Sequence, residues 1–478
     1  FLHFGTGEAT EIASVEIKFP SGKQLLLQNV KTDQSISIYE SDADLKPANK
    51  SVSATLFSQK SQGIFNYVHR ENDFIDFKRE PLIPYKCSRK GPYYARGDVN
   101  ADGRQDIFIG GSAGNEGKLM LQNADGSFSE KKQPAFVMDK KFEDAGVSFF
   151  DADGDKDQDL YVASGGSEFD IGDALYQDRL YINDGKGNFS RAVKALPKEN
   201  HNASYVLPLD FDEDGDNDLF IGGGVLPGKF PKHDKNILLL NNGGMFEDVS
   251  EQLAPALKNT GIVNYADWND LNADGKKELV LAGEWMPVTI LQWNGKQFLQ
   301  KDFTVKNILA SSPVALNTVN GWWNCVKLAD VDGDGDNDII AVNRGLNSRI
   351  TARYDEPCTI YAKDFDNNGS YDAVLGYYTW GKLYPMYHRD QLIDQMPSMR
   401  KKFIRYHQYA GKTLDEIFSE DQKKGMDIFK ANFFESGVFV NEGNNGFRFE
   451  AFPELAQLSV INDFILADFD NDGIKDII

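Results

Sequence analysis

An acidic pattern of nine residues recurs seven times along the chain, with oxygen-bearing side chains at positions 1, 3, 5 and 9. The clearest copy contains Asp330, Asp332, Asp334, Gly335 and Asp338. Hard cations such as Ca²⁺ take about six to eight oxygen ligands on a sharply turning backbone. Alternating carboxylates supply oxygens, the position-7 carbonyl can add another, and glycine at position 6 permits the turn. Seven copies in one chain predict calcium loops rather than incidental acidic turns.

We number the loops one to seven by their first residues. Positions 1, 3, 5, 7 and 9 are the predicted metal-binding positions, with position 7 acting through its backbone carbonyl. They are Asp98, Asn100, Asp102, Arg104, Asp106 in loop one; Asp151, Asp153, Asp155, Asp157, Asp159 in loop two; Asp210, Asp212, Asp214, Asp216, Asp218 in loop three; Asp270, Asn272, Asp274, Lys276, Glu278 in loop four; Asp330, Asp332, Asp334, Asp336, Asp338 in loop five; Asp364, Asp366, Asn368, Ser370, Asp372 in loop six; and Asp468, Asp470, Asp472, Ile474, Asp476 in loop seven.

Three loops carry fewer charges, because asparagine replaces one acid at Asn100, Asn272 and Asn368. We expect weaker calcium binding there than in loops three, five and seven. Loop two has Lys156 where the other loops have glycine, which predicts a strained turn or a lower affinity. All seven loops are expected to be structural, since a saturated carboxylate cage stabilises a hairpin and leaves no open position for chemistry.

The residues after each loop indicate strands. An EF-hand would place a bidentate glutamate at position 12, but loops one, two, three and five have Ile109, Val162, Ile221 and Ala341 there. Short apolar runs follow position 9 directly, as in Leu160-Tyr161-Val162. Such runs are typical of strands buried on both faces. Each loop is therefore predicted to join two neighbouring antiparallel strands.

The spacing of the loops predicts a repeated four-stranded sheet. Loops one to five begin at intervals near 60 residues, a period that suits one blade of a β-propeller. Hairpin turns of the Asn-Gly and Asp-Gly type, each followed by Phe, recur after the first four loops and again between Asn441 and Phe447. The order within a blade is then strand, calcium loop, strand, connection, strand, glycine turn, strand. We predict an all-β fold with seven blades, and six as the alternative.

Assignment of the later blades is less direct. Loop five has no obvious hairpin of its own, and loop six either begins blade six, using the hairpin at Asn441, or forms the outer turn of blade five. The last blade is incomplete at Ile478. Residues 56–77 are candidates for the outermost strand that closes the ring, which would remove an exposed sheet edge.

Three domains are predicted. Residues 1–45 form a small β module, with strands expected at Val15–Phe19, Gln24–Leu27 and Ser35–Tyr39. Residues 46–90 are a linker that includes the closing strand. Residues 91–478 form the propeller, with a helical insertion at 388–430 in which Thr413 and Glu416 match a capping box.

Net charge and composition exclude some classes of function. The formal net charge is −22, but 25 of the 73 acidic residues occupy positions 1, 3, 5 and 9 of the loops. Seven bound Ca²⁺ ions would leave about −8, an ordinary value. No basic face is evident, which argues against nucleic acid, and no apolar run has the length of a membrane span. Carboxylate-rich loops of weak affinity fill only where calcium is plentiful, which predicts an extracytoplasmic location.

Other candidate sites are less specific. Cys87, Cys325 and Cys358 have no metal-binding spacing, and are either buried thiols or include a Cys325–Cys358 disulfide. The six histidines show no zinc spacing. His69, Glu71, Asp73 and Asp76 form either an acid/base group or a set of hydrogen bonds that fixes a linker.

Two long loops, Gly165–Arg179 and Gly222–Lys235, should emerge on the same rim. Together with a set of aromatic residues they form a candidate recognition surface, unless those aromatics pack between blades. The set is Trp285, Trp322, Trp323, Tyr377, Tyr378 and Trp380. The helical insertion either caps the ring or docks a partner.

The sequence resembles two known families. The loops and the apolar strands that follow them resemble FG-GAP repeats, also called VCBS repeats, which form the propeller blades of integrin α-subunits and of many bacterial surface proteins. The opening His3-Phe4-Gly5-Thr6-Gly7, together with Val15-Glu16-Ile17, Phe19-Pro20-Ser21-Gly22 and Tyr39-Glu40, resembles the ASPIC/UnbV domain. The two resemblances cover nearly the whole chain, and the combination looks like large repeat proteins of Bacteroidetes.

These resemblances imply a function at the cell surface. Such proteins are often exported lipoproteins or outer-membrane-associated, and are encoded beside nutrient-uptake transporters of the SusC/SusD type. We therefore expect a binding or scaffold protein at a bacterial outer surface, with a protein or glycan ligand and no transmembrane span. The chain itself is interpreted as an interior portion of a longer protein. The alternative is a polysaccharide lyase or hydrolase, although no catalytic constellation stands out in the sequence.

Overall fold

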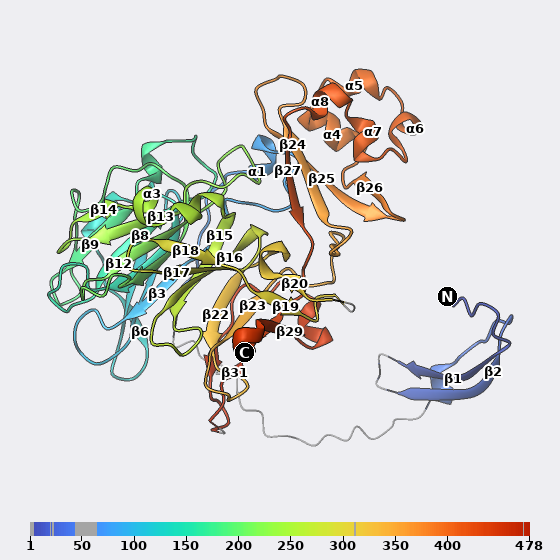
Figure 1. The fold of residues 1–478 in the computed structure, drawn as a ribbon, viewed down its shortest axis with the longest axis horizontal. Coiled ribbons are helices and arrows are strands. Elements are labelled where there is room, and N and C mark those ends of the chain that lie inside the picture. The colour runs from blue at the N-terminus through green and yellow to red at the C-terminus, as the bar shows by residue number, and fades with distance from the viewer. Residues whose placement is uncertain (1–3, 20, 22, 44–64, 310–311, 472) are drawn as a thin grey trace. The chain divides into compact units, whose positions relative to one another are not determined.

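The chain folds into two compact units in a computed structural model, residues Phe1–Gln62 and Gly63–Ile478 (Figure 1). The structure describes residues 4–19, 21, 23–43, 65–309, 312–471 and 473–478. Strands dominate both units, and the helices that the structure describes are short. The fold is all-β in class.

The first unit contains one antiparallel hairpin. Strand β1 (Glu11–Lys18) pairs with β2 (Gln24–Lys31), with Glu11 opposite Lys31, and a 3-10 turn follows at Glu40–Asp42. The strand predicted at Ser35–Tyr39 is wrong, because these residues form no ladder. Pro20 and Gly22 of the predicted turn lie outside the described residues.

Four complete sheets follow one another along the second unit, each a four-stranded antiparallel meander. The first consists of β3 (Tyr94–Gly97), β4 (Asp106–Ile109), β5 (Lys118–Gln122) and β6 (Phe128–Glu130). The second has β7 (Asp144–Phe150), β8 (Asp159–Ser164), β9 (Arg179–Asn183) and β10 (Phe189–Arg191). The third has β11 (Ala203–Leu209), β12 (Asp218–Gly223), β13 (Ile237–Asn241) and β14 (Phe246–Asp248). The fourth has β15 (Ile262–Asn269), β16 (Glu278–Met286), β17 (Thr289–Trp293) and β18 (Phe298–Lys301), with β21 (Gly321–Trp322) also paired to β16.

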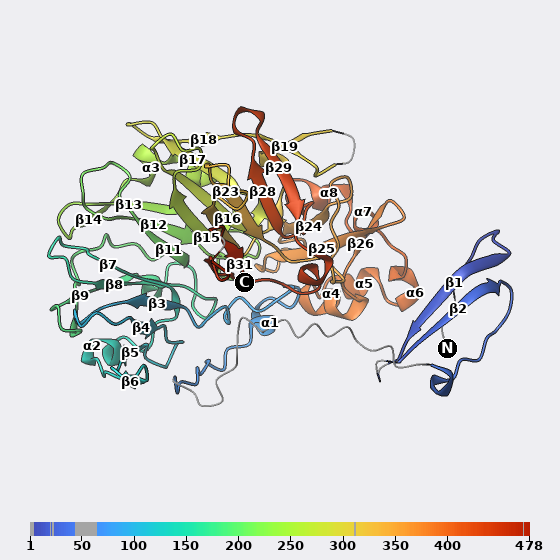
Figure 2. The same cartoon turned by 90° about the horizontal axis from the view of Figure 1, so that it is seen from below.

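The fifth sheet is assembled from distant segments. Its first two strands, β22 (Cys325–Ala329) and β23 (Asp338–Val342), are completed by β28 (Gly437–Asn441) and β29 (Phe447–Ala451) (Figure 2). Strand β19 (Thr304–Lys306) extends it in parallel to β29, and β20 (Val314–Ala315) follows. The hairpin at Asn441 therefore belongs with loop five, and its assignment to loop six was wrong. The sequence order hides this pairing because residues 343–436 intervene.

The intervening residues form a separate sheet covered by helices. Its strand order is β26 (Lys382–Pro385), β25 (Asp372–Thr379), β24 (Cys358–Lys363) and β27 (Asp427–Ala431). Loop six joins β24 to β25, so it neither begins a blade of the main series nor forms the outer turn of blade five. Five short helices lie together beside this sheet in Figure 1: α4 (Arg389–Gln395), α5 (Met399–Lys402), α6 (Tyr406–Tyr409), α7 (Leu414–Ile417) and α8 (Glu420–Lys423). Their buried side chains pack on Val374 of β25.

The capping box in this insertion is present. Glu416 Oε2 accepts hydrogen bonds from the Thr413 backbone N–H, at 2.9 Å, and from the Thr413 hydroxyl, at 3.1 Å. These bonds satisfy donors at the N-terminus of α7, which has too few residues to be stable alone. The helices cover the inserted sheet, where Leu392, Leu414 and Phe418 are buried.

The sheets of the second unit stack in sequence order. One apolar cluster combines Phe108 and Leu119 of the first sheet with Leu160 and Val162 of the second, and equivalent clusters join the second to the third, the third to the fourth and the fourth to the fifth. A final two-stranded sheet of β30 (Leu466–Ala467) and β31 (Asp476–Ile477) packs on the fifth. This series contains six of the seven loops. A seven-bladed closed ring remains a prediction.

The segment before the first sheet runs along the other sheets without joining them. Residues 65–75 form no strand, and α1 (Asp76–Arg79) follows. Among residues 65–77 the predicted closing strand is therefore wrong, and residues 56–64 lie outside the described part of the chain. The Arg79 guanidinium donates to the carbonyls of Ser167 and Phe169, at 3.0 and 2.8 Å, and Glu80 accepts from the Phe230 N–H at 2.9 Å. These contacts fasten the segment to the connections that follow β8 and β12. Two further short helices, α2 (Pro134–Met138) and α3 (Ser250–Leu253), lie between sheets in sequence.

Candidate metal centre

The acidic loops occupy equivalent places in their sheets. Six of them join the first and second strands of a sheet in the stacked series, and loop six joins β24 to β25 of the inserted sheet. Position 9 is the first residue of the second strand in every case, as Asp159 is for β8 and Asp338 is for β23. The strand thus fixes the position-9 carboxylate, while positions 1 to 8 form the turn.

The loop backbone passes twice through the left-handed region. Position 6 has a positive φ in all seven loops, from 75° at Lys156 to 101° at Gly335. Position 4 also has a positive φ throughout, for example 57° at Ala101 and 63° at Glu213. Sequence reasoning identified position 6 through its glycines but missed position 4, where the residue type varies. Lys156 adopts the same conformation as the glycines, so loop two carries the strain that its sequence predicted.

Position 1 organises the turn through backbone hydrogen bonds. The Asp330 carboxylate accepts from the N–H groups of Gly333 and Gly335, at 2.6 and 3.0 Å. The Gly369 N–H donates to Asp364 in the same way, at 2.9 Å. These bonds hold the carboxylate inside the turn, because N–H donors around a carboxylate fix its orientation.

Position 9 is held from two sides. Asp159 Oδ2 accepts from the Ala152 N–H at 2.9 Å, and its Oδ1 accepts from the Asn183 N–H at 2.8 Å. Asp218 and Asp338 repeat this arrangement with the N–H groups of Asn241 and Asn441. Each of the three asparagines is the last residue of the third strand of the same sheet. The position-9 carboxylate therefore ties the loop to the third strand.

Carboxylates from positions 1, 3 and 9 converge in five loops. One oxygen from each of the three side chains lies within 4.8 Å of the other two. The five groups are Asp151, Asp153, Asp159; Asp210, Asp212, Asp218; Asp330, Asp332, Asp338; Asp364, Asp366, Asp372; and Asp468, Asp470, Asp476. Loops one and four have Asn100 and Asn272 at position 3 and so have only two acids at these three positions. Asp472 lies outside the described residues.

The carboxylates fit a hard cation. Four buried loop oxygens have no hydrogen-bond donor among the described residues: Asp157 Oδ1, Asp210 Oδ1, Asp336 Oδ1 and Asp366 Oδ1. Burial, reinforced by neighbouring loop carboxylates, raises the pKa of Asp159 and Asp218 to about 7 and the pKa of Asp336 to about 6. Orphaned oxygens and clustered negative charge destabilise the bare loop, and a divalent cation with oxygen ligands would relieve both. Calcium bound here would supply charge neutralisation and cross-link the two strands.

Three of the four residues proposed as an acid/base group, His69, Glu71 and Asp76, form hydrogen bonds. His69 Nε2 lies 2.9 Å from Glu71 Oε1, and its Nδ1 lies 3.1 Å from the Tyr67 hydroxyl. Asp76 is buried and accepts from Ser88 Oγ at 2.6 Å and Ser167 Oγ at 2.8 Å. Its hydrogen bonds to Ser88 and Ser167 help hold its pKa below the usual range, although burial opposes them. The Asp76–Ser167 bond joins the linker to the connection after β8, as the alternative interpretation expected, whereas the contacts of His69 lie within the linker.

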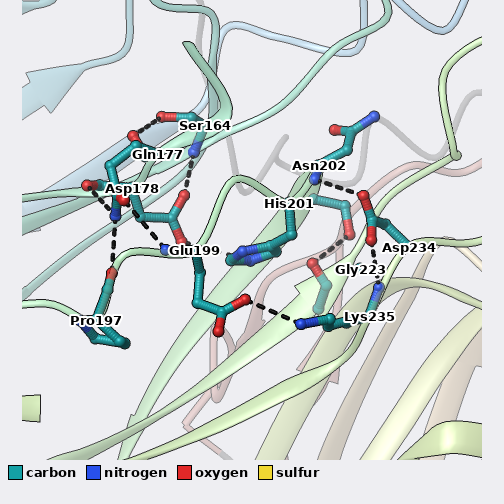
Figure 3. Close-up of polar contacts among 12 residues, drawn as sticks. Ser164, Gln177, Asp178, Pro197, Glu199, His201, Asn202, Gly223, Asp234 and Lys235 are labelled. Carbon is teal, nitrogen blue, oxygen red and sulfur yellow. Dashed lines mark hydrogen bonds and ion pairs between the residues drawn. The ribbon is translucent and has the colours of Figure 1, made fainter. Parts of the chain in front are cut away.

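The two long loops contact the connection between the second and third sheets (Figure 3). From the first loop, Gln177 Nε2 donates to the Pro197 carbonyl at 3.1 Å; from the second, Lys235 Nζ lies 3.0 Å from Glu199. His201 is buried between them, with Nε2 3.7 Å from Asp178 Oδ2. These contacts pack part of both loops against the connection, whereas residues 170–174 of the first loop are exposed.

The predicted aromatic surface divides into core and exposed parts. Trp322 and Trp323 are buried, and Trp285 packs with Trp322 at a ring-centroid distance of 4.9 Å. Trp322 and Trp285 lie in the cluster between the stacked sheets and the inserted sheet. Trp380 is 93% exposed at the tip of the β25–β26 hairpin, with a φ of 51°. Its neighbours Tyr377 and Tyr378 are half-buried.

All three cysteines are free and buried, so the possible Cys325–Cys358 disulfide is wrong. Cys325 lies in β22 of the fifth sheet, where it packs with Ile340 and Val342, whereas Cys358 lies in β24 of the inserted sheet. Burial raises the pKa of the Cys358 thiol to about 12, which makes it a poor nucleophile and metal ligand.

Comparison with known proteins identifies repeat modules in this all-β chain. Residues 98–162 and 270–341 match the FG-GAP-like repeat, and residues 1–45 match the ASPIC and UnbV domain. The two repeat matches include loops one and two and loops four and five, together with the strands that lie between the two loops of each match. Comparison with curated protein sequences gave no match.

Among solved structures, the chain is similar to the biofilm matrix protein Bap1 of V. cholerae. The sequence identity is 12%, the TM-score is 0.28, and the match covers 81% of this chain and 76% of that protein. In the described part of this chain, none of the helices has the length and apolar character needed to cross a membrane.

Proposed function

We propose that the chain is an extracytoplasmic scaffold or binding protein whose stacked sheets form a calcium-stabilised β-propeller. The observation that carries the proposal is the convergence of three carboxylates in each of five loops, at equivalent places in their sheets. The FG-GAP-like repeat matches support the propeller arrangement. In loops one and four the asparagine at position 3 would take the place of the third carboxylate ligand, so the chain would bind up to seven Ca²⁺ ions.

The proposed calcium is structural. Each of these five bare loops brings three carboxylate oxygens within 4.8 Å of one another, and each close pair costs on the order of 1 kcal/mol even in a high dielectric. A cation bound by the folded loop stabilises the fold by mass action. The loops lie at strand ends, so their occupancy would control strand pairing throughout the series.

Calcium removal tests this proposal. We expect excess EGTA to lower the melting temperature of the full chain by about 10 °C or more, and added Ca²⁺ to restore it. Asp332→Asn should weaken the effect of calcium, whereas Asp421→Asn, on the exposed face of α8, should not. An unchanged melt in EGTA, measured by circular dichroism, would rule out a stabilising metal.

We further propose that the protein acts at a bacterial outer surface, lipid-anchored or associated with a SusC/SusD-type transporter, and contacts a protein or glycan through the β25–β26 hairpin. The support is the exposed Trp380 at the hairpin tip, since aromatic side chains with large free area serve as binding anchors. Affinity capture from the native envelope in calcium should recover a partner with the wild type and much less with Trp380→Ala. Equal recovery with both would place the contact elsewhere.

A further inference from the structure

Three asparagines connect the calcium loops of neighbouring sheets. Asn183, Asn241 and Asn441 are each the last residue of a third strand, and their side chains are only 5, 2 and 6% exposed. Asn241 Nδ2 donates to the carbonyl of Asn217, at position 8 of its own loop, and to that of Ala152, at position 2 of the preceding loop, at 3.0 and 2.9 Å. One buried amide thus contacts two loops.

The same asparagines are linked to metal-binding carboxylates at both ends, directly at one end and through one backbone residue at the other. The Asn241 N–H donates to Asp218 Oδ1 in loop three at 2.8 Å. Ala152, whose carbonyl accepts from Asn241, donates its N–H to Asp159 Oδ2 in loop two at 2.9 Å. A continuous series of hydrogen bonds therefore runs from the position-9 ligand of loop three to the position-9 ligand of loop two.

The arrangement repeats at two other junctions. Between loops one and two, Asn183 Nδ2 donates to the Val99 carbonyl at 2.9 Å, and the Val99 N–H donates to Asp106 at 3.2 Å. Between loops four and five, Asn441 Nδ2 donates to the Leu271 carbonyl at 2.9 Å, and the Leu271 N–H donates to Glu278 at 3.0 Å. In both cases the asparagine N–H bonds the position-9 acid of its own loop.

The junction between loops three and four is different. The last residue of β17 is Trp293, whose ring packs edge-on against Phe211, the position-2 residue of loop three, at a centroid distance of 4.9 Å. The Trp293 indole in this position does not supply the hydrogen bond that the asparagine amide supplies at the other junctions. The hydrogen-bonded series is interrupted here, which divides loops one to five into a set of three and a set of two.

We propose that Asn183, Asn241 and Asn441 are positioning residues that couple calcium binding between adjacent loops, within loops one to three and within loops four and five. This inference rests on the proposed calcium function. Metal binding at loop three fixes Asp218, and through Asn241 and Ala152 it fixes Asp159 in the orientation that loop two needs. Coupling of this kind is reciprocal, so each loop of a set raises the affinity of its neighbour.

The test uses the full chain and Ca²⁺ alone, with site number and affinity measured by calorimetry or equilibrium dialysis. Asp212→Ala disables loop three. We expect it to remove one site and to weaken a second by about threefold or more, in the range of ordinary coupling. Asp366→Ala disables loop six, which no such asparagine joins to another loop among the described residues, and it should remove one site only.

Variants of the asparagine identify the connection. Asn241→Ala should weaken calcium binding at two sites. In the double variant with Asp212→Ala, the neighbouring site should bind calcium no more weakly than it does in Asp212→Ala alone. Asn294→Ala is the matched control, because Asn294 accepts only from Lys296 and Gln297 within its own hairpin, and it should weaken none. If Asn241→Ala does not fold, Asn217→Ala removes the second contact between these loops, a 3.3 Å bond to the Asp151 carbonyl.

The outcomes separate the two ideas. A wild-type chain that binds no Ca²⁺ would refute the proposed function and the coupling together. A wild type that binds Ca²⁺, with Asp212→Ala losing a single site and leaving the others at full affinity, would refute the coupling alone.

Discussion

Lys156 occupies a backbone position that suits glycine. Its φ of 75° lies in the same left-handed region as that of Gly335 and the other position-6 residues, and a side chain in this region costs about 1–2 kcal/mol. Lys156→Gly should therefore raise the free energy of unfolding by about 0.5 kcal/mol, since part of the relief is offset by the greater freedom of glycine in the unfolded chain. The reverse change in loop five, Gly335→Lys, should lower it by about 1 kcal/mol. Urea denaturation in saturating calcium measures both, and equal effects of the same sign would contradict the argument.

Glu143 is a second residue whose native environment lowers the free energy of unfolding, and here the effect depends on pH. Burial, followed by the charge of Glu168, raises the pKa of Glu143 to about 9. Its Oε2 accepts from Asn72 Nδ2 at 3.1 Å, and the same amide donates to Glu168 Oε1 at 2.9 Å. Because the folded pKa exceeds the unfolded value near 4.5, folding takes up a proton between these two pKa values. The contribution of Glu143 to stability is complete below pH 4.5 and falls as the pH rises through 9.

Glu143→Gln should flatten this dependence. The glutamine keeps an acceptor for Asn72 and cannot ionise, so it should stabilise the protein at pH 8 by on the order of 2 kcal/mol relative to the wild type, and by less at pH 5. Unfolding at both pH values checks the difference, with the exposed Glu251→Gln as control. Parallel pH profiles for Glu143→Gln and the wild type would show that the carboxylate is already ionised in the fold.

At the scale of elements, loop six and the helices beside it form one unit. Gln395 Nε2 from α4 donates to Asp372 Oδ1 at 2.8 Å, and Phe418, just after α7, stacks on Phe365 of the loop with centroids 3.9 Å apart. The helices have four to seven residues and little stability of their own. Their order therefore depends on the loop.

Disabling loop six should release the helices. Asp366→Ala is expected to increase the rate of tryptic cleavage between residues 399 and 412 by about fivefold or more in calcium, because local opening controls proteolysis of such segments. Asp153→Ala in loop two should leave that rate unchanged. Acceleration by both variants would indicate general loosening instead.

The elements that the sequence predicted well are those coded locally. The spacing of Asp330, Asp332 and Asp338 defines a turn and the strand after it, and the strands formed as expected. The partner of β23 could not be read in the same way, because β28 follows only after residues 343–436. The exposure of Trp322 and Trp380 was equally hidden, since it depends on where the inserted sheet packs. The sequence indicates a hairpin turn after the third strand, but the contact of Asn241 with loop two depends on the three-dimensional arrangement of the sheets.

At the scale of the whole molecule, the chain divides into two compact units, and the hydrophobic clusters of the described residues lie in the second. Compact units of this kind generally fold alone. A chain of residues 63–478 should therefore keep the calcium-dependent melt of the full protein, with a melting temperature within about 2 °C of it. Calorimetry of both chains in calcium and in EGTA provides the measurement. A fall of more than about 5 °C in the shorter chain would show that residues 1–62 contribute to the stability of the sheets.

The interrupted fifth sheet also has a consequence for biosynthesis. Strands β22 and β23 leave the ribosome long before β28 and β29, and at roughly 5–20 residues per second the delay is about 5–20 s. Throughout that interval β23 exposes an open edge of apolar residues, the kind of surface that recruits stray strands. Nascent chains should therefore be most prone to aggregate while residues 343–436 are being translated, and chaperone demand should peak there.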